Sequence, residues 1–312
     1  METVLLTLHQ VVLMLALLAI GAICARLGWF SETVAQGLSK FLLWFVTPAL
    51  LIDAYRRPFE AQMAVYLLLA GVLGALFHLM SALLAQVLVR KGDRDQRAVA
   101  RMSVVYSNCG FMAFPLISSV LGDTGLFYGS AFVGVFNLSL WTHGQYLLRG
   151  REGLSPRRAL CNAGVLGTLT GLLLYLSQLP LPSIVADTIS SLASLNTPLA
   201  MLVIGSFLAH CRLHTLLRQD VIYPALLRML VCPLCLLALL YLLRVPHWCA
   251  AGAQLGLVTM LCASCPSAAS SVLMTASLGM DSGYGSRIIL LTSLLSVAVI
   301  PALSLATTLV LA

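Results

Sequence analysis

The sequence has 312 residues, of which 60% are hydrophobic and only 9% are charged. A soluble domain carries about 25% charged residues, so this composition excludes a soluble globular protein and predicts an integral membrane protein. The formal net charge of +7 comes from Lys and Arg residues that lie mostly in alternate connections between apolar segments. We interpret this pattern as a mark of membrane orientation, and nucleic acid is not expected as a partner.

Apolar runs of about 20 residues predict membrane-spanning helices, and ten such runs follow one another along the chain. They cover residues 4–25, 34–54, 62–89, 98–120, 124–148, 159–178, 186–209, 220–243, 250–278 and 283–311. The first run is too long for the core of a signal peptide, and we expect it to be the first span. The connections are short, so no soluble domain is expected between the spans.

The basic residues predict how these spans are oriented. Arg and Lys gather after the first, third, fifth and seventh spans, whereas the opposite connections hold little beyond Arg56, Arg57 and Arg244. Because connections rich in Lys and Arg stay in the cytoplasm, both termini are expected to lie outside. We expect the protein to lie in the cell membrane, that is, the inner or plasma membrane, where the lipid bilayer is its partner.

Features of the first half of the chain recur in the second half. The recurring pairs, at offsets of 150 to 157 residues, are Thr47-Pro48 with Thr197-Pro198, Pro115 with Pro266, Leu121-Gly122 with Leu278-Gly279, and Gly129-Ser130 with Gly285-Ser286. They predict two homologous halves of five spans each, residues 1–150 and 151–312. Since five is odd, the second half enters the membrane from the opposite side. Inverted repeats with interrupted helices at equivalent positions are typical of secondary transporters.

The fourth and ninth spans contain the residues that break a helix. Residues 107–117, SNCGFMAFPLI, include Asn108 and Pro115, and residues 264–267, SCPS, include Pro266. Proline removes a backbone donor, and unsatisfied backbone groups are costly in hydrocarbon, so such breaks favour a polar cavity. We expect the two breaks to cross near the middle of the bilayer, where positive half-helix ends bind an anion.

The predicted substrate-binding residues come from both breaks and from polar positions of neighbouring spans. They are Asn108, Cys109, Gly110, Pro115, Ser264, Pro266, Ser267, Asn137 and Asn196. The side-chain amide of Asn108 is able to donate to a carboxylate, and the serines bring hydroxyl groups to the second break. A structural interpretation stays open, because proline kinks are common in membrane helices and Ser or Cys also pack between them.

Asp53 is the carboxylate that lies most clearly inside an apolar run. An acidic residue within a span is by default a candidate for function, which makes Asp53 a candidate for proton coupling. Arg56 and Arg57 follow a turn later, so a local ion pair explains Asp53 equally well.

Nine cysteines include two CxxC pairs, Cys232 with Cys235 and Cys262 with Cys265. This spacing is typical of zinc or redox sites, but both pairs lie in apolar spans, where cysteine behaves as a small hydrophobic residue. We expect no metal, no cofactor and no disulfide.

Together these motifs resemble those of the auxin efflux carrier family, which includes the plant PIN-FORMED carriers and bacterial permeases assigned to malate, malonate and related acids. The matching residues are Gly21, Arg26-Leu27-Gly28, Gly37-Leu38-Ser39-Lys40, Pro48-Ala49-Leu50-Leu51, Ser107-Asn108-Cys109-Gly110, Pro115-Leu116, Pro266, Ser270, Leu273 and Gly279-Met280-Asp281. The similarity covers essentially the whole chain. The long cytoplasmic loop of many plant members is missing, as in the bacterial ones.

The resemblance implies an all-α fold of ten transmembrane helices in two inverted repeats, with helices four and nine broken and crossed, like the sodium/proton antiporters and bile-acid carriers. It implies a scaffold part from spans 1, 2, 6 and 7, a transport part from spans 3–5 and 8–10, and a homodimer. It also implies that Asn108, Pro115 and Pro266 hold the carboxylate of the substrate. The second break, residues 265–267, departs from the first because it has no side-chain amide.

We therefore predict a secondary transporter that moves a small organic anion, a carboxylate, by alternating access. Coupling to protons, to the membrane potential or to neither stays open, and sodium is less favoured because the breaks carry no carboxylate. The alternative is a membrane-embedded sensor with the same fold and no transport. An enzyme is not expected, because no HExxH, no GxSxG and no paired carboxylates within the spans appear.

Overall fold

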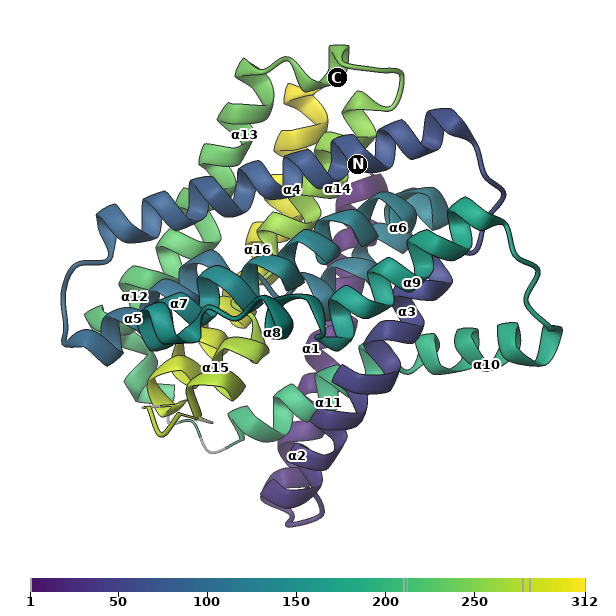
Figure 1. Cartoon of the computed structure of the whole chain (residues 1–312). Helices are drawn as coiled ribbons and strands as arrows, with labels where there is room; N and C mark the ends of the chain where they lie inside the picture. The colour runs from purple at the N-terminus through teal and green to yellow at the C-terminus, as the bar shows by residue number, and fades with distance from the viewer. Residues whose placement is uncertain (1, 210, 212, 277, 281, 312) are drawn as a thin grey trace.

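The structure, a computed structural model, describes residues 2–209, 211, 213–276, 278–280 and 282–311. Within these ranges every regular element is a helix (Figure 1), which confirms the predicted all-α membrane fold. Asp281 of the ninth-span motif lies outside the described residues, and so does the side chain of Leu273.

The helices cover most of each predicted apolar run, but the ten runs do not correspond one to one to ten separate helices. The α-helices are α1 (Glu2–Arg26), α2 (Glu32–Phe41), α3 (Thr47–Ala54), α4 (Ala61–Leu88), α5 (Arg94–Val105), α6 (Phe114–Ser139), α7 (Gln145–Arg149), α8 (Pro156–Leu160), α9 (Ala163–Ser177), α10 (Ser183–Ser194), α11 (Asn196–Leu208), α12 (Gln219–Leu226), α13 (Cys232–Leu242), α14 (Gly252–Ser264), α15 (Ala269–Ala276) and α16 (Ser282–Val310). The π-helices are η1 (Leu42–Val46), η2 (Cys109–Ala113), η3 (Leu140–Gly144) and η6 (Leu227–Val231), and the 3-10 helices are η4 (Gly150–Gly153), η5 (Leu213–Leu217) and η7 (Val245–His247).

Seven helical segments of the described residues are long and apolar enough to cross a membrane. One of them, Cys109–Gly153, has 45 residues. At about 1.5 Å per residue it is more than twice as long as the hydrocarbon core is thick. It is therefore too long for a single crossing of the membrane. The chain turns inside this segment at Gly122, whose φ of 60° lies in the region that favours glycine. Two further helices, Ala163–Ser177 and Gly252–Ser264, are apolar but shorter.

Three of the π-helices are each followed by a proline two residues after they end. These prolines are Pro48 after η1, Pro115 after η2 and Pro233 after η6. Proline has no N–H, and its ring clashes with the carbonyl four residues earlier in an α-helix. The wider π-turn, with its i to i+5 hydrogen bonds, moves that carbonyl aside. The helices therefore continue through their prolines with one wide turn.

Glycines allow two helix pairs to approach closely. A Cβ on Gly205 of α11 would overlap the carbonyl oxygen of Leu18 in α1, and a Cβ on Gly21 of α1 would overlap that of Leu202 in α11. Gly167 of α9 packs in the same way on the backbone of α3. Small residues at helix contacts are typical of membrane proteins, where packing rather than water drives association.

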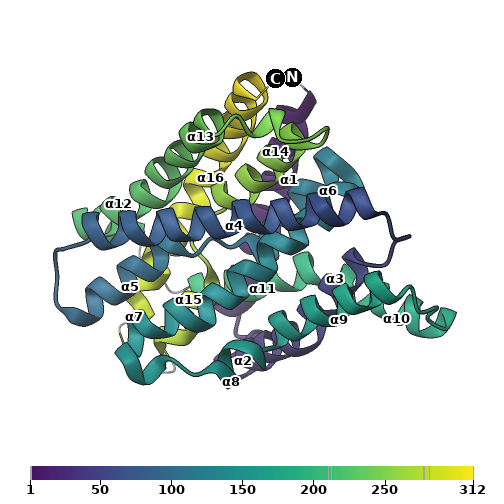
Figure 2. The same ribbon diagram turned by 45° about the horizontal axis from the view of Figure 1, so that its top comes forward.

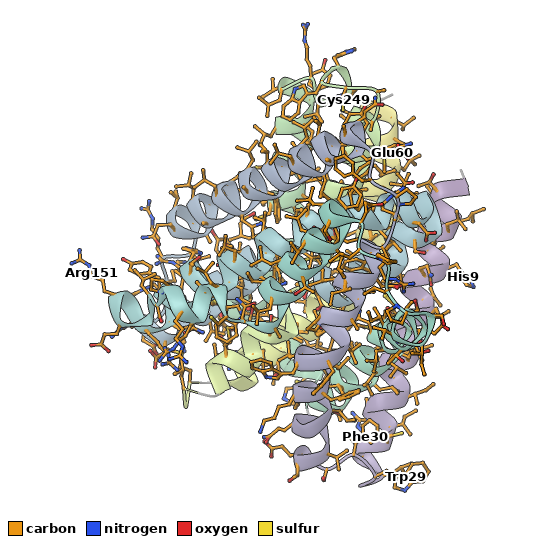
Figure 3. The ribbon with its side chains drawn as sticks, turned by 45° about the vertical axis from the view of Figure 1, so that its right-hand side comes forward. His9, Trp29, Phe30, Glu60, Arg151 and Cys249 are labelled. Carbon is orange, nitrogen blue, oxygen red and sulfur yellow. The ribbon has the colours of Figure 1, made fainter. Side chains whose placement is uncertain are left out.

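The connections gather at two opposite ends of the molecule. Trp29 and Phe30, between α1 and α2, lie far from Glu60 and Cys249, which lie at the other end (Figure 3). The start of α1 and the end of α16 also lie at that other end (Figure 2), and these two helices contact each other. Arg151 lies at the left edge of the molecule in Figure 3, apart from both of these ends.

The close contact of α1 with α11 gives a prediction about stability. Gly205→Ala places a methyl group against the Leu18 carbonyl, and overpacking of this kind costs about 1–3 kcal/mol. We expect a lower apparent unfolding temperature for the detergent-solubilised protein. Gly37→Ala is the matched control, because nothing lies within 4 Å of a Cβ at that position of α2. Equal unfolding temperatures for the two variants would contradict the close contact.

Candidate functional site

Two interrupted helices meet inside the molecule. The helix α5 is separated from η2 by residues 106–108, and α14 is separated from α15 by residues 265–268. The two extended segments run antiparallel, with an isolated bridge between Ser107 and Ser267. The structure thus brings the two predicted breaks together.

Backbone hydrogen bonds hold the two segments against each other. The N–H of Asn108 donates to the carbonyl of Pro266 at 2.7 Å, and the N–H of Ala268 donates to the carbonyl of Tyr106 at 2.9 Å. Both breaks therefore satisfy part of their freed backbone by pairing with each other, as the membrane interior demands.

The first break falls at the start of the predicted stretch 107–117 and not at Pro115. The break lies at residues 106–108, and Pro115 lies in the first turn of α6, directly after η2. In the π register the carbonyl of Gly110 would accept from the N–H of residue 115, which proline does not have. The side-chain amide of Asn196, at the start of α11, donates to the Gly110 carbonyl instead, at 3.1 Å.

A cavity of about 190 Å³ lies beside the crossing. Three of the predicted site residues, Asn108, Gly110 and Asn137, line it. Residues that the sequence did not single out as site residues add to the lining, namely Thr47, Phe111, Phe136, Trp141 and Ser270. The cavity therefore combines amide and hydroxyl groups with aromatic walls, which is the usual composition of a small-molecule site.

The side chain of Asn137 is positioned by contacts with its own helix, α6, and with α9. The Asn137 amide donates to the carbonyl of Val133 at 2.9 Å, and Gly164 of α9 leaves room for the Asn137 side chain. The hydroxyl of Thr47 is buried and has no hydrogen-bond partner in the described part of the chain.

Other predicted site residues do not line the cavity. Cys109, Ser264 and Ser267 are buried. The Ser264 hydroxyl donates to the carbonyl of Leu261 at 3.2 Å, and the Ser267 hydroxyl donates to that of Ser103 at 2.8 Å. These serines stabilise the ends of the broken helices, which makes them structural in this conformation.

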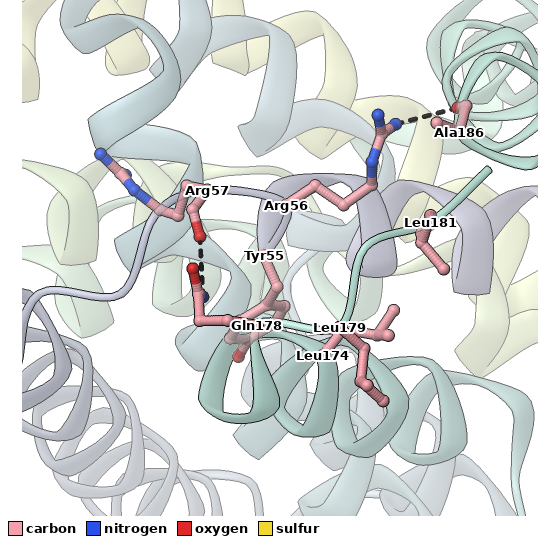
Figure 4. Close-up of a pocket in the computed structure, with 8 residues that line it drawn as sticks. All are labelled: Tyr55, Arg56, Arg57, Leu174, Gln178, Leu179, Leu181 and Ala186. Atoms are coloured by element: carbon pink, nitrogen blue, oxygen red, sulfur yellow. Dashed lines mark hydrogen bonds between the residues drawn. The ribbon is translucent and has the colours of Figure 1, made fainter. Parts of the chain in front are cut away.

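Asp53 lies away from the crossing, near the end of α3. Its carboxylate accepts from the Arg56 guanidinium at 2.7 Å and from the Ser190 hydroxyl of α10 at 2.8 Å. Arg56 also donates to the carbonyl of Ala186 at 2.9 Å, as Figure 4 shows beside a second cavity of about 280 Å³. The local ion pair that the sequence offered as one explanation is present, and it ties α3 to α10.

In the described ranges no three His, Cys, Asp or Glu side chains gather as a metal site. The members of both CxxC pairs are free thiols.

Sequence reasoning missed Arg228. This residue lies in η6, inside the apolar run 220–243, and it is fully buried. Its guanidinium donates to carbonyls of both broken helices, including that of Val104 at 3.1 Å and that of Cys265 at 3.2 Å. The signal was visible, because a charged residue within a span is a functional candidate whatever its sign.

The contact between Asn196 and Gly110 predicts that the effects of substituting Asn196 and Pro115 on stability depend on each other. Asn196→Ala leaves a buried carbonyl without its donor, which costs about 1–3 kcal/mol, so the apparent unfolding temperature should fall. Pro115→Ala in the same background returns an N–H to that carbonyl. We expect the double variant to be more stable than the sum of the two single effects predicts. Strictly additive effects in this double-mutant cycle would refute the exchange of donors.

Comparison with known proteins finds no match among curated proteins. The family model described as "Membrane transport protein", which covers the auxin efflux carriers, matches the chain twice, over residues 6–155 and 153–304. The two matches together span almost the whole sequence, and each falls on one of the two predicted halves. The suspected resemblance is confirmed, and the chain belongs to this family of membrane transport proteins, the auxin efflux carrier family.

Proposed function

We propose that this transporter moves a small organic anion, a carboxylate, through the cavity beside the crossed helices by alternating access. The observation that carries the proposal is that Asn108 and Gly110 of the first broken helix, Ser270 of the second, and Asn137 line one cavity. The helices that begin at Asn108 and near Ser270 point their N-terminal ends toward this region. Free amides and positive partial charge at such ends favour an anion.

The charges in the interior support an anion rather than a cation as substrate. No Asp or Glu is buried among the described residues, whereas Arg228 is. A site for a cation would need carboxylates or a ring of free carbonyls. The amide of Asn108 supplies a donor that fits a carboxylate oxygen.

The proposed architecture is ten spans in two inverted repeats. The family model supports it by matching each half once. The helix contacts support it as well, because α1 packs on α11 and α3 packs on α9. Here α1 is the first span and α9 the sixth, whereas α3 belongs to the second span and α11 to the seventh. The contact of the first span with the seventh therefore has its counterpart in the contact of the sixth span with the second, as two equivalent halves require.

The proposed division into a scaffold and a transport part gives the cavity one wall from each. Leu43 of η1 and Thr47 of α3 lie on the scaffold side, and Asn108 and Asn137 lie on the transport side. Rocking of one part against the other would open the cavity first to one side and then to the other. The basic connections face the cytoplasm in this proposal, both termini lie outside, and the protein is a homodimer in the cell membrane.

The family match favours a transporter over the alternative, a sensor with the same fold. Purified protein in liposomes separates the two, because a sensor binds its ligand and moves none. Uptake of a radiolabelled carboxylate that binds is the expected result.

The role of Asn108 is tested with a thermal-shift screen of acetate, malonate, succinate and benzoate on the purified protein. We expect at least one of these carboxylates to raise the apparent unfolding temperature. Asn108→Ala should reduce the affinity for it about 10- to 100-fold, since a hydrogen bond to a charged group contributes about 1.5–3 kcal/mol.

Asn162→Ala is the control for this experiment. Asn162 is also buried, but it caps α9 with its side chain and does not line the cavity. The control should be less stable and still respond to the carboxylate like the wild type. A carboxylate that stabilises wild type and Asn108→Ala equally would remove Asn108 from the site.

A further prediction concerns Asp53. Since its carboxylate is engaged by Arg56 and Ser190, we propose a structural role, and Asp53→Asn should leave the pH profile of uptake as in the wild type, with a small loss of stability. Asp187→Asn, at an exposed position of α10, is the control. Loss of the pH dependence in Asp53→Asn alone would instead assign proton coupling to this carboxylate.

A further inference from the structure

Arg228 forms hydrogen bonds to four carbonyl groups where α5 and α14 end. Its Nη1 donates to the carbonyls of Val104 and Val105 at 3.1 and 3.4 Å. Its Nε donates to the carbonyl of Cys265 at 3.2 Å, and its Nη2 donates to that of Ala263. The side chain is 0% exposed. One guanidinium therefore joins both broken helices from a third span.

These carbonyls are the ones that a helix cannot satisfy by itself. The last carbonyls of any α-helix lack a partner within the helix. In α5 the carbonyl of Ser103 accepts from the Ser267 hydroxyl, and those of Val104 and Val105 accept from Arg228. Without the guanidinium, the ends of both helices would be left unpaired within the protein interior.

The charges of this arrangement balance. The C-terminal end of a helix carries about half a negative charge, so the two ends that meet here carry about one. The guanidinium carries one positive charge at any physiological pH. In the described part of the chain no buried Asp or Glu takes part in this balance.

Carbonyl oxygens converging from half-helix ends and unwound backbone are also the ligands that transporters use for sodium, and that channels use for potassium. We propose that the Arg228 guanidinium is the resident cation of the crossing, filling a carbonyl-lined site that would otherwise hold a soluble monovalent cation. The positive charge at the crossing is therefore supplied by the protein itself. Anion binding beside Asn108 then needs no sodium or potassium, a consequence that rests on the proposed function.

Packing alone does not account for a buried arginine. Burying a charge carries a large desolvation cost, and apolar residues of similar volume often replace buried charges without loss of stability. Arg228 does have an apolar contact, because its guanidinium lies 5.4 Å from the centre of the Phe77 ring. A methionine at this position would keep such a contact and leave the carbonyls of two helix ends without a cation.

The first test needs no substrate. The purified full-length chain is titrated with NaCl, KCl and choline chloride at constant ionic strength, and its apparent unfolding temperature is measured. We expect wild type to respond equally to the three salts. Arg228→Met should show a saturable rise with sodium or potassium over choline, of about 5 °C when the cation exceeds its Kd about 100-fold.

Two further variants make the result decisive. Arg228→Lys keeps a fixed cation and should be folded and indifferent to the salt. Arg56→Met removes an arginine from the partly exposed pair with Asp53 and should show no preference for sodium or potassium. A folded Arg228→Met that does not distinguish the salts would overturn the proposal. If Arg228→Met fails to fold in every salt, an Arg228→Lys variant that fails likewise would overturn it, and a folded, salt-indifferent one would support it.

The second test uses benzoate and malonate as probes. Whichever of them binds wild type should do so with the same Kd, within about twofold, in the three salts. Arg228→Met should bind it at least tenfold more weakly in choline chloride and recover in sodium or potassium chloride. A wild-type protein that needs sodium to bind would overturn the inference. If neither of them binds, and acetate and succinate do not bind either, the proposed function fails, and the salt titration still decides the role of Arg228.

Discussion

The whole structure depends on one constraint, which is that a polypeptide in hydrocarbon must hydrogen-bond its own backbone. Ordinary spanning helices meet it internally, but two helices of this protein stop in the interior. The extended segments 106–108 and 265–268 meet the constraint in part by pairing with each other, through Asn108 with Pro266 and Tyr106 with Ala268. Arg228 satisfies carbonyls that remain. The breaks are thus one joint structure rather than two separate kinks.

The same structure bears on where the proposed substrate would be held. The ends that Arg228 covers are the negative ends of α5 and α14, so the positive ends that follow, at η2 and α15, are left to face a ligand. The cavity beside Asn108 lies next to these positive ends and takes its other wall from η1 and α3. A bound anion would therefore contact both the scaffold part and the transport part, which are proposed to move relative to each other.

Much of this arrangement could be predicted from the sequence, because it follows from hydropathy and from helix-breaking residues. The apolar runs, the recurrence of motifs in the two halves, and Asn108 as a cavity residue are all local patterns. The exact position of the first break was not predictable from Pro115, since a π-turn allows a helix to continue through a proline. Arg228 is a different case, because the sequence showed its charge and only the fold shows that its partners are backbone carbonyls.

The π-turns before Pro48 and Pro233 lie inside continuous helices and have a consequence for how variants of these spans are interpreted. Each wide turn inserts one extra residue, which rotates everything beyond it by about 100° relative to an uninterrupted helix. A helical wheel drawn for the whole of one of these spans will therefore assign the residues of one end to the wrong side. Substitutions intended for the lipid face on that basis will fall on an internal contact, and the two ends of each span need separate wheels.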